Sequence, residues 1–219
     1  MVIFNILKVI HKMLITAGLS VTLVAVPALA GMHEDLFAAV EGNDSRWLKE
    51  LIAEGGDPNS VDQDGNSLLM IAARDGRENA LKVLLGTKLK IDARNRLGET
   101  ALMLAAVEGR TSVAKQLVFN GAQVEFKGWN PMLYAASRGR DEVIELLVNL
   151  GANVNTAAPN GVTPLMMAVR GDYRSTVKLL LAKGANPNMK TDRGDTALTW
   201  AMDRGHSEIG VTLMEAGAK

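Results

Sequence analysis

The chain contains no cysteine. It therefore has no disulfide bond and no thiol nucleophile, and its folded state must be stabilised by packing. The cysteine that carries a lipoprotein-type lipid anchor is missing as well. This one absence excludes a disulfide-stapled domain, a cysteine-dependent enzyme and a lipoprotein.

Acidic residues are missing from the first 30 positions, and this segment predicts a secretory signal peptide. Lys8 and Lys12 come first, an uncharged run follows from Met13 to Val26, and Ala28-Leu29-Ala30 has the small-x-small pattern of a cleavage site. We expect cleavage of the signal peptide 1–30 after Ala30, a mature chain of residues 31–219 and a bacterial periplasmic location.

The same segment has a second interpretation, an uncleaved membrane anchor. The uncharged stretch from Met13 to Met32 has 20 residues, which is just enough to span a bilayer. Thr16, Gly18 and Ser20 dilute the run, and the cleavage site is well formed. These two features favour cleavage over a membrane anchor.

An excess of charge of one sign is lacking too. Without Lys8 and Lys12, the 24 basic residues fall to 22 against 24 acidic ones, which gives the mature chain a net charge of −2. Tight binding to phosphate backbones requires clustered positive charge. The charge balance therefore does not favour nucleic acid as a partner.

One stretch recurs five times along the chain. It reads GVTPLMMAV from Gly161, and the other copies are GNSLLMIAA from Gly65, GETALMLAA from Gly98, GWNPMLYAA from Gly128 and GDTALTWAM from Gly194. The Ser, Thr or Asn two residues after each glycine recurs at intervals of 33, 30, 33 and 33 residues. A fixed period of this size is the signature of a repeat protein.

Each copy predicts two helices joined by a tight turn. The Ser, Thr or Asn suits the N-cap of the first helix, and Pro131 and Pro164 suit its first position. The turn after this helix requires a left-handed residue, which is glycine in four units and Asn43 or Asp172 in two. A second helix then ends at another glycine. The glycines are Gly76, Gly109, Gly139 and Gly205 in the turns and Gly55, Gly121, Gly151, Gly184 and Gly217 after the second helices.

This arrangement resembles the ankyrin-repeat family. The resemblance rests on Thr163-Pro164-Leu165, on alanine pairs such as Ala72-Ala73, and on the G-A-N-V-N and G-A-N-P-N endings at Gly151 and Gly184. It covers residues 31–219 and implies an all-α solenoid of stacked helix-turn-helix units with hairpin-like loops. The units it implies are 34–61, 62–94, 95–125, 126–157, 158–190 and 191–219, of which the first and last are caps.

The chain departs from the family pattern in three ways. The usual histidine after the Thr-Pro-Leu motif is absent, and an apolar packing stripe is expected instead, with a Met-rich metal or redox site as the alternative. Lys88 replaces the terminal glycine of the second unit and is expected to be strained if left-handed, and Gly210 weakens the last helix. The residues in the place of the histidine are Phe37, Met70, Met103, Leu133, Met166 and Thr199.

No catalytic constellation is visible. His33 and His206 stand at opposite ends of the predicted solenoid, so they cannot share a metal ion or a proton relay. The carboxylates fall mostly in loops, and the glycines follow the repeat period instead of forming a phosphate-binding loop. We therefore expect no enzyme, no cofactor and no metal site.

The resemblance implies where a protein partner would bind. In the ankyrin family the contact residues lie on the concave face, in the loops around the glycine that precedes each first helix and at the ends of the first helices. The candidate partner-binding residues are Arg96, Phe126, Lys127 and Trp129 in the loops and Glu108, Arg138, Arg170 and Arg204 at the helix ends.

The loop after Gly121 is three residues shorter than its neighbours. It carries Phe126 and Trp129, in a chain with only 4% aromatic residues. Exposed aromatic side chains near arginines are typical anchors of interfaces. Alternatively, the two rings fold down onto the stack and cover the gap that the missing residues leave. Tyr134 and Trp200 follow the place of the missing histidine, and we expect them in the core.

Arg77, Arg110 and Arg140 follow the turn glycine in three successive units. One interpretation is a positive stripe that steers an acidic partner. The other is a solvated edge whose charge is neutralised by nearby carboxylates. Those carboxylates are Asp75, Glu108, Asp141 and Glu142.

The sequence thus predicts a non-catalytic, exported ankyrin-repeat protein, monomeric by itself, that binds another periplasmic protein through its concave face. Two other roles stay open. One is a membrane-tethered scaffold or inhibitor with an uncleaved N-terminal helix. The other is an accessory protein that protects or delivers a periplasmic redox or metal enzyme through the methionine stripe.

Overall fold

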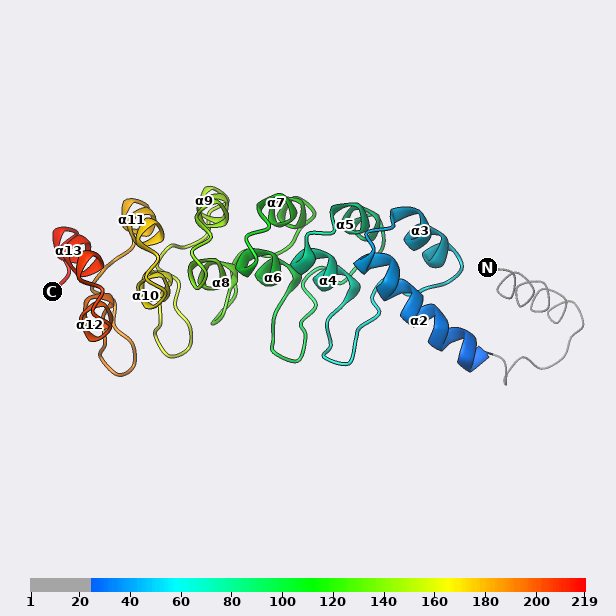
Figure 1. Cartoon of the computed structure of the whole chain (residues 1–219), viewed down its shortest axis with the longest axis horizontal. Coiled ribbons are helices and arrows are strands. Elements are labelled where there is room, and N and C mark those ends of the chain that lie inside the picture. Colours follow the sequence, from blue (N-terminus) through cyan, green and yellow to red (C-terminus); the bar gives the residue numbers. More distant parts are fainter. Residues whose placement is uncertain (1–24) are drawn as a thin grey trace, which may run out of the picture.

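The computed structural model describes the backbone of residues 25–219 and the side chains of residues 31–219. This part of the chain folds into six helix pairs, which stack side by side in chain order (Figure 1). The first helices of the pairs are α2 (Ala25–Glu41), α4 (Leu68–Asp75), α6 (Ala101–Val107), α8 (Pro131–Ala136), α10 (Pro164–Arg170) and α12 (Ala197–Asp203). The second helices are α3 (Ser45–Ala53), α5 (Glu78–Leu85), α7 (Thr111–Phe119), α9 (Asp141–Asn149), α11 (Arg174–Ala182) and α13 (Ser207–Glu215).

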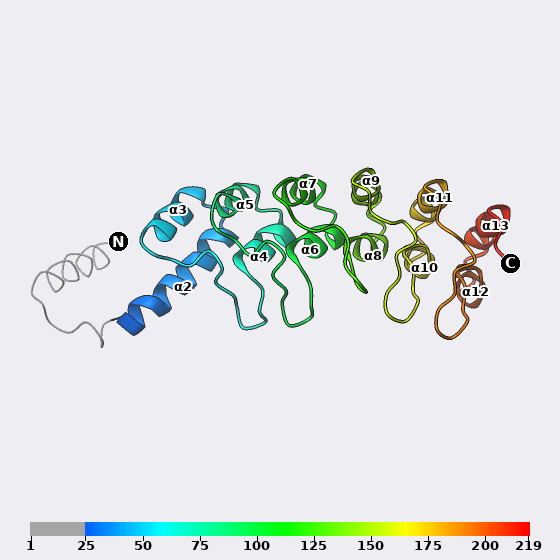
Figure 2. The ribbon, with the colours of Figure 1, turned by 180° about the vertical axis from the view of Figure 1, so that it is seen from behind.

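The described residues are all-helical, as expected. Their only extended pairing outside the helices is an isolated antiparallel bridge between Val61 and Ser67. The first helices form one row and the second helices form another, and the hairpin loops project beyond the row of first helices (Figures 1 and 2). The predicted solenoid of helix-turn-helix units is confirmed.

Most of the predicted signal peptide, residues 1–24, lies outside the described residues. The expected cleavage position after Ala30 falls inside α2, which begins at Ala25. Within residues 25–219, no helix combines the length and the apolar character needed to cross a membrane. Cleavage and anchoring therefore both stay predictions.

Each first helix from α4 onward begins at the side-chain cap that the sequence predicts. Asn130 and Thr163 accept a hydrogen bond from the backbone N–H three residues later, at 3.2 and 3.3 Å, and a proline opens both α8 and α10. Loss of such a cap typically costs about 1 kcal/mol. The caps of α4, α6 and α12 are Ser67, Thr100 and Thr196.

The turn inside each pair is left-handed where it was predicted to be. The four turn glycines have φ values between 64° and 71°. Asn43 and Asp172 are the two non-glycine residues with positive φ in residues 25–219, both at 54°. Asn43 also reaches the next unit, because its Oδ1 accepts hydrogen bonds from Asn79 N and Ala80 N in the first turn of α5, at 3.1 and 3.0 Å.

Lys88 is not left-handed, so the strain expected for a left-handed Lys88 does not arise. Helix α5 has 8 residues where α7 has 9, and it ends before Gly86, whose φ is −80°. Thr87 Oγ1 donates to Leu84 O at 2.7 Å, and Asn59 Nδ2 donates to Lys88 O at 3.1 Å. The shorter helix ends on these side-chain bonds, so no left-handed residue is needed at Lys88.

The methionine stripe packs in the core, as expected. Met70, Met103, Leu133 and Met166 are each at most 1% exposed. The sixth unit departs from the stripe because the side chain of Thr199 is exposed. Its Oγ1 accepts a hydrogen bond from Thr196 N at 2.8 Å, so this residue closes the N-terminus of α12 instead of joining the core.

Asparagine side chains tie the loops of neighbouring units together. Asn155 Nδ2 donates to Gly184 O at 3.1 Å, and its Oδ1 accepts from Asn186 N at 2.7 Å. The same pair of bonds to the following unit is made by Asn59 and Asn188. In the two middle units the equivalent residues are Asp92 and Glu125. Each carboxylate accepts a hydrogen bond from a backbone N–H of the following unit but has no N–H with which to donate a second one.

Candidate protein-binding surface

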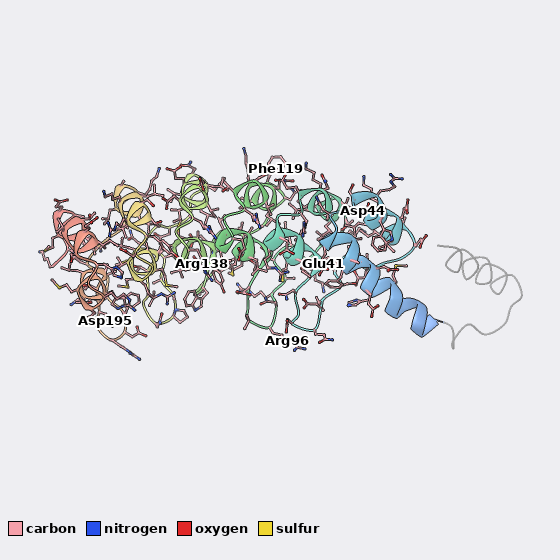
Figure 3. The ribbon with its side chains drawn as sticks, in the orientation of Figure 1. Glu41, Asp44, Arg96, Phe119, Arg138 and Asp195 are labelled. Carbon is pink, nitrogen blue, oxygen red and sulfur yellow. The ribbon has the colours of Figure 1, made fainter. Side chains whose placement is uncertain are left out.

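The exposed sides of the first helices and the hairpin loops beside them form one face of the solenoid, which we call the inner face. Figure 3 shows Arg96 on a hairpin loop and Arg138 beside α8, whereas Phe119 points away from α7 at the opposite edge. All eight candidate residues lie on the inner face. Arg96, Phe126, Lys127 and Trp129 are in its loops, and Glu108, Arg138, Arg170 and Arg204 stand at or just beyond the ends of α6, α8, α10 and α12.

One apolar or aromatic residue recurs at the same repeat position in each first helix from α4 to α12. Three of them are almost enclosed, since Ile71, Leu104 and Met167 are 4%, 9% and 3% exposed. The other two, Tyr134 and Trp200, are half-buried. Both rings pack against the hydrophobic core, as expected, but neither is fully enclosed by it.

Phe126 and Trp129 in the short loop behave differently from one another. Phe126 is half-buried, and its ring centroid lies 4.5 Å from the guanidinium carbon of Arg94. Trp129 is 43% exposed and meets Tyr134 edge to face, with centroids 6.0 Å apart and an interplanar angle of 79°. Phe126 is therefore partly covered by Arg94, and Trp129 is the more exposed of the two rings.

Glu99 fixes the position of Tyr134 from the preceding loop. Burial raises the pKa of Tyr134 to about 12, together with the negative charge of Glu99 and a hydrogen bond to its carboxylate. Glu99 Oε2 accepts from Asn95 Nδ2 at 2.8 Å, and the same amide donates to Asn66 Oδ1 at 2.8 Å. This polar chain crosses three units and holds the platform on which Trp129 rests.

Four of the basic candidates keep their charges uncompensated. They are exposed, and within residues 31–219 their side chains take part in no ion pair and no hydrogen bond. Arg204 instead lies over the ring of Trp200, with its guanidinium carbon 5.4 Å from the centroid. Arg74 differs, because its Nε lies 2.8 Å from Asp75 Oδ1. The four uncompensated residues are Arg96, Lys127, Arg138 and Arg170.

The arginines that follow the turn glycines are bonded to the preceding unit. Arg110 Nε donates to Arg74 O at 3.2 Å, and Arg140 Nε donates to Val107 O at 2.9 Å. Both side chains lie against the left-handed glycine of the preceding turn. Arg77 Nε is buried without a hydrogen-bond partner in the described part of the chain. These residues do not form a free positive stripe, since two of them act as ties between repeats and the negative charge of Asp75 interacts with Arg77 and Arg110.

Sequence reasoning missed two contributors to this surface. The sequence could have indicated Tyr134, because this residue is aromatic at the repeat position that Ile71, Leu104 and Met167 occupy in other units. Arg94 precedes Phe126 by 32 residues, about one repeat period, but no residue type announces that the two side chains meet.

The chemistry of the inner face is that of recognition. Within residues 25–219, no group of three His, Asp or Glu side chains is arranged to hold a metal ion. The methionines of the stripe are enclosed in separate units, so they are not accessible to a soluble metal. The inner face offers a supported tryptophan and several free guanidinium groups, which are the components of protein interfaces. The fold and this face together define a repeat-built interaction protein.

Comparison with known sequences gives the family. The family described as Ankyrin repeats (3 copies) matches residues 36–127, 120–191 and 159–219. The chain belongs to the ankyrin-repeat family. Ankyrin repeats are protein–protein interaction modules, and the fold is typically non-catalytic.

The relatives share repeats with this chain over part of their length. An ankyrin repeat protein of Rickettsia bellii is 30% identical over 138 residues, which cover 58% of this chain and 39% of the relative. An ankyrin repeat and KH domain-containing protein of Caenorhabditis briggsae is 34% identical over 103 residues, 45% of this chain and 4% of the relative. A glycerophosphocholine phosphodiesterase of Schizosaccharomyces pombe is 38% identical over 122 residues, 56% of this chain and 8% of that enzyme. This chain thus spans less than half the length of each of these proteins.

Proposed function

We propose that this chain is a non-catalytic binding protein that docks one protein partner on its inner face. The observation that carries the proposal is Trp129, which is 43% exposed yet held edge-on against Tyr134. Two uncompensated positive charges lie near Trp129 in the chain. Lys127 comes two residues before it, and Arg138 lies just beyond the C-terminal end of α8. An aromatic ring that is already fixed loses little conformational entropy on binding, and such rings beside arginine are typical interface hot spots.

The proposed location is the periplasm, after cleavage at Ala30. The basic start, the uncharged run and the Ala28-Leu29-Ala30 site support it. Cleavage there would also leave the core contacts of α2 in place. Leu36, Ala39 and Val40 are at most 1% exposed, and all three lie beyond the cleavage position.

Site-specific photo-cross-linking tests the binding face. Benzoylphenylalanine at Trp129 should yield one discrete protein adduct when the tagged chain is irradiated in its native host. The matched control is the same probe at Phe119, an aromatic residue that is 90% exposed on α7, which belongs to the row of second helices. An adduct from Phe119 alone, or equal adducts from both positions, would contradict the inner face as the docking surface.

The same tagged protein tests the location. Mass spectrometry of the periplasmic fraction should give a chain that begins at Gly31. A full-length chain in the membrane fraction would instead support the membrane-tethered scaffold or inhibitor.

A further inference from the structure

The charge of the inner face changes along the stack. At the ends of the first helices, the N-terminal units carry Glu41, the paired Arg74 and Asp75, and Glu108. The C-terminal units carry Arg138, Arg170 and Arg204 at or just beyond the ends of three successive first helices, with Asp203 as the one acidic neighbour at these positions. Figure 3 shows Glu41 close to α2 and Arg138 further along the stack, beside α8. At the ends of the first helices, the C-terminal half of the inner face is thus the basic half.

A ring precedes two of these arginines by four residues. Tyr134 and Trp200 lie on α8 and α12, and Arg138 and Arg204 come just after the last residues of these helices. Tyr134 supports the exposed Trp129, and Arg204 lies over Trp200. The two ring-and-arginine pairs are two units apart and flank Arg170, which is exposed and uncompensated.

The spacing of these groups suits an extended chain. Neighbouring packed helices lie about 8–10 Å apart, which places the two ring-and-arginine pairs at about 20 Å. A polyproline II segment repeats every three residues with a rise of about 9 Å, close to the distance from one helix to the next. About six or seven residues of extended peptide therefore cover α8, α10 and α12, with every third side chain turned to the surface.

We propose that α8, α10 and α12 bind an extended acidic segment of the partner protein, whose carboxylates meet Arg138, Arg170 and Arg204 and whose apolar side chains rest on Trp129 and Trp200. This inference rests on the proposed function, since it names the chemistry of the partner for the same face. Charge complementarity of this kind raises the association rate and selects among partners. The free guanidinium groups also match carboxylates in a bidentate geometry.

A peptide fits this surface better than a nucleic acid does. Asp203 stands directly beside Arg204, and Glu99 bonds to Tyr134 beneath Trp129. These carboxylates oppose a continuous row of phosphates, whereas a peptide can place a neutral residue opposite each of them. A single-stranded oligonucleotide therefore belongs among the test ligands as the competing outcome.

The test uses synthetic peptides and the purified chain. The probe is a fluorescein-labelled peptide of 12 residues with Glu at every third position, Leu beside each Glu, and Ser or Gln elsewhere. The comparison peptides carry Gln or Lys in place of each Glu, and a labelled oligonucleotide of equal length is measured alongside. Fluorescence anisotropy at low salt should show binding of the Glu peptide at least tenfold tighter than that of either comparison peptide.

Two charge-reversed variants locate the binding. The triple variant R138E/R170E/R204E should lose tenfold or more in affinity for the Glu peptide and gain affinity for the Lys peptide. The matched control is K82E/K115E/K178E, which changes the net charge equally at exposed residues on α5, α7 and α11. This control should keep the affinity within threefold. Circular dichroism confirms that both variants stay folded.

Several results would overturn the inference. They are equal binding of the Glu, Gln and Lys peptides, no binding of any of them, an equal loss in the two triple variants, or tighter binding of the oligonucleotide. Such a result leaves the proposed function standing if the cross-link at Trp129 still forms, because the partner would then bind there by another chemistry. Without that cross-link, the proposed function itself fails.

Discussion

Arg140 donates a hydrogen bond from its guanidinium Nε to the carbonyl oxygen of Val107, which lies one repeat earlier, at 2.9 Å. Replacement of Arg140 by methionine removes this bond and leaves the carbonyl at the end of α6 with one bond fewer. We expect a loss of about 1.5–3 kcal/mol of unfolding free energy, as for other hydrogen bonds that involve a charged group. Urea unfolding measures the change. The exposed Arg138→Met is the control, and an equal loss in both variants would refute the role of Arg140 as a tie between repeats.

Gly210 is predicted to be a removable weak point. It lies inside α13, and a Cβ added there would meet no atom within 4 Å. Gly210→Ala should therefore stabilise the chain by about 1 kcal/mol through its higher helix propensity. Gly205→Ala, at a φ of 71°, should destabilise it, because alanine is strained in a left-handed turn. Thermal unfolding compares the two variants, and a gain at Gly205 or a loss at Gly210 would contradict the prediction.

Asp75 should make the stability of the chain depend on acid. The hydrogen bond from Arg74 lowers the pKa of Asp75 below its ordinary value of 3.8, although burial acts in the opposite direction. The group is therefore a stronger acid when folded, and its contribution is complete above about pH 4 and is lost as the pH falls through the folded pKa. The stability gap between the native chain and Asp75→Asn should be present at neutral pH and close in acid.

Chemical denaturation between about pH 7 and pH 2.5 measures that gap. The control is Asp203→Asn, because Asp203 is exposed and belongs to no ion pair in the described residues. A gap for Asp75→Asn that stayed constant with pH would show that the ion pair with Arg74 adds nothing to the folded state.

Tyr134 should resist ionisation in base. Its pKa is raised to about 12 by burial and by Glu99, from an ordinary value of 10.0. The chain has 2 tyrosines, so Tyr173→Phe leaves Tyr134 as the single phenol that titrates. Near pH 11 this phenol should stay mostly protonated, and Glu99→Gln should raise the ionised fraction. Ultraviolet difference absorbance reports the tyrosinate. Equal ionisation with and without Glu99 would mean that the loop does not hold the ring.

The local rules of the repeat were readable from single residues. Thr163 and Asn130 predicted where helices begin, because a capping oxygen acts only on the N–H groups next to it in the chain. Asn43 and Asp172 predicted left-handed turns without glycine, because Asn and Asp tolerate a left-handed backbone better than other non-glycine residues. The apolar stripe followed from the period, since equivalent residues of a stack face the same core.

Contacts between units were not readable in this way. The partner of Arg140 is a backbone carbonyl, which every residue carries, so no residue type announces it. Arg94 and Phe126 lie in neighbouring units, and no residue type announces that their side chains meet. The sequence did not show how α5 ends without a left-handed glycine, because the bonds from Thr87 and Asn59 that close this end depend on the fold. The candidate residues were located by the period, whereas the platform under Trp129 required the coordinates.

The short hairpin before α8 has one more consequence. Three residues are absent from it, yet α6, α8 and α10 remain neighbours in an unbroken row (Figure 1). A hairpin of this architecture can therefore be three residues shorter while the row of first helices stays intact. A change of ligand therefore does not require a change in the buried core, because a longer or shorter hairpin loop changes the residues that the inner face presents to a partner.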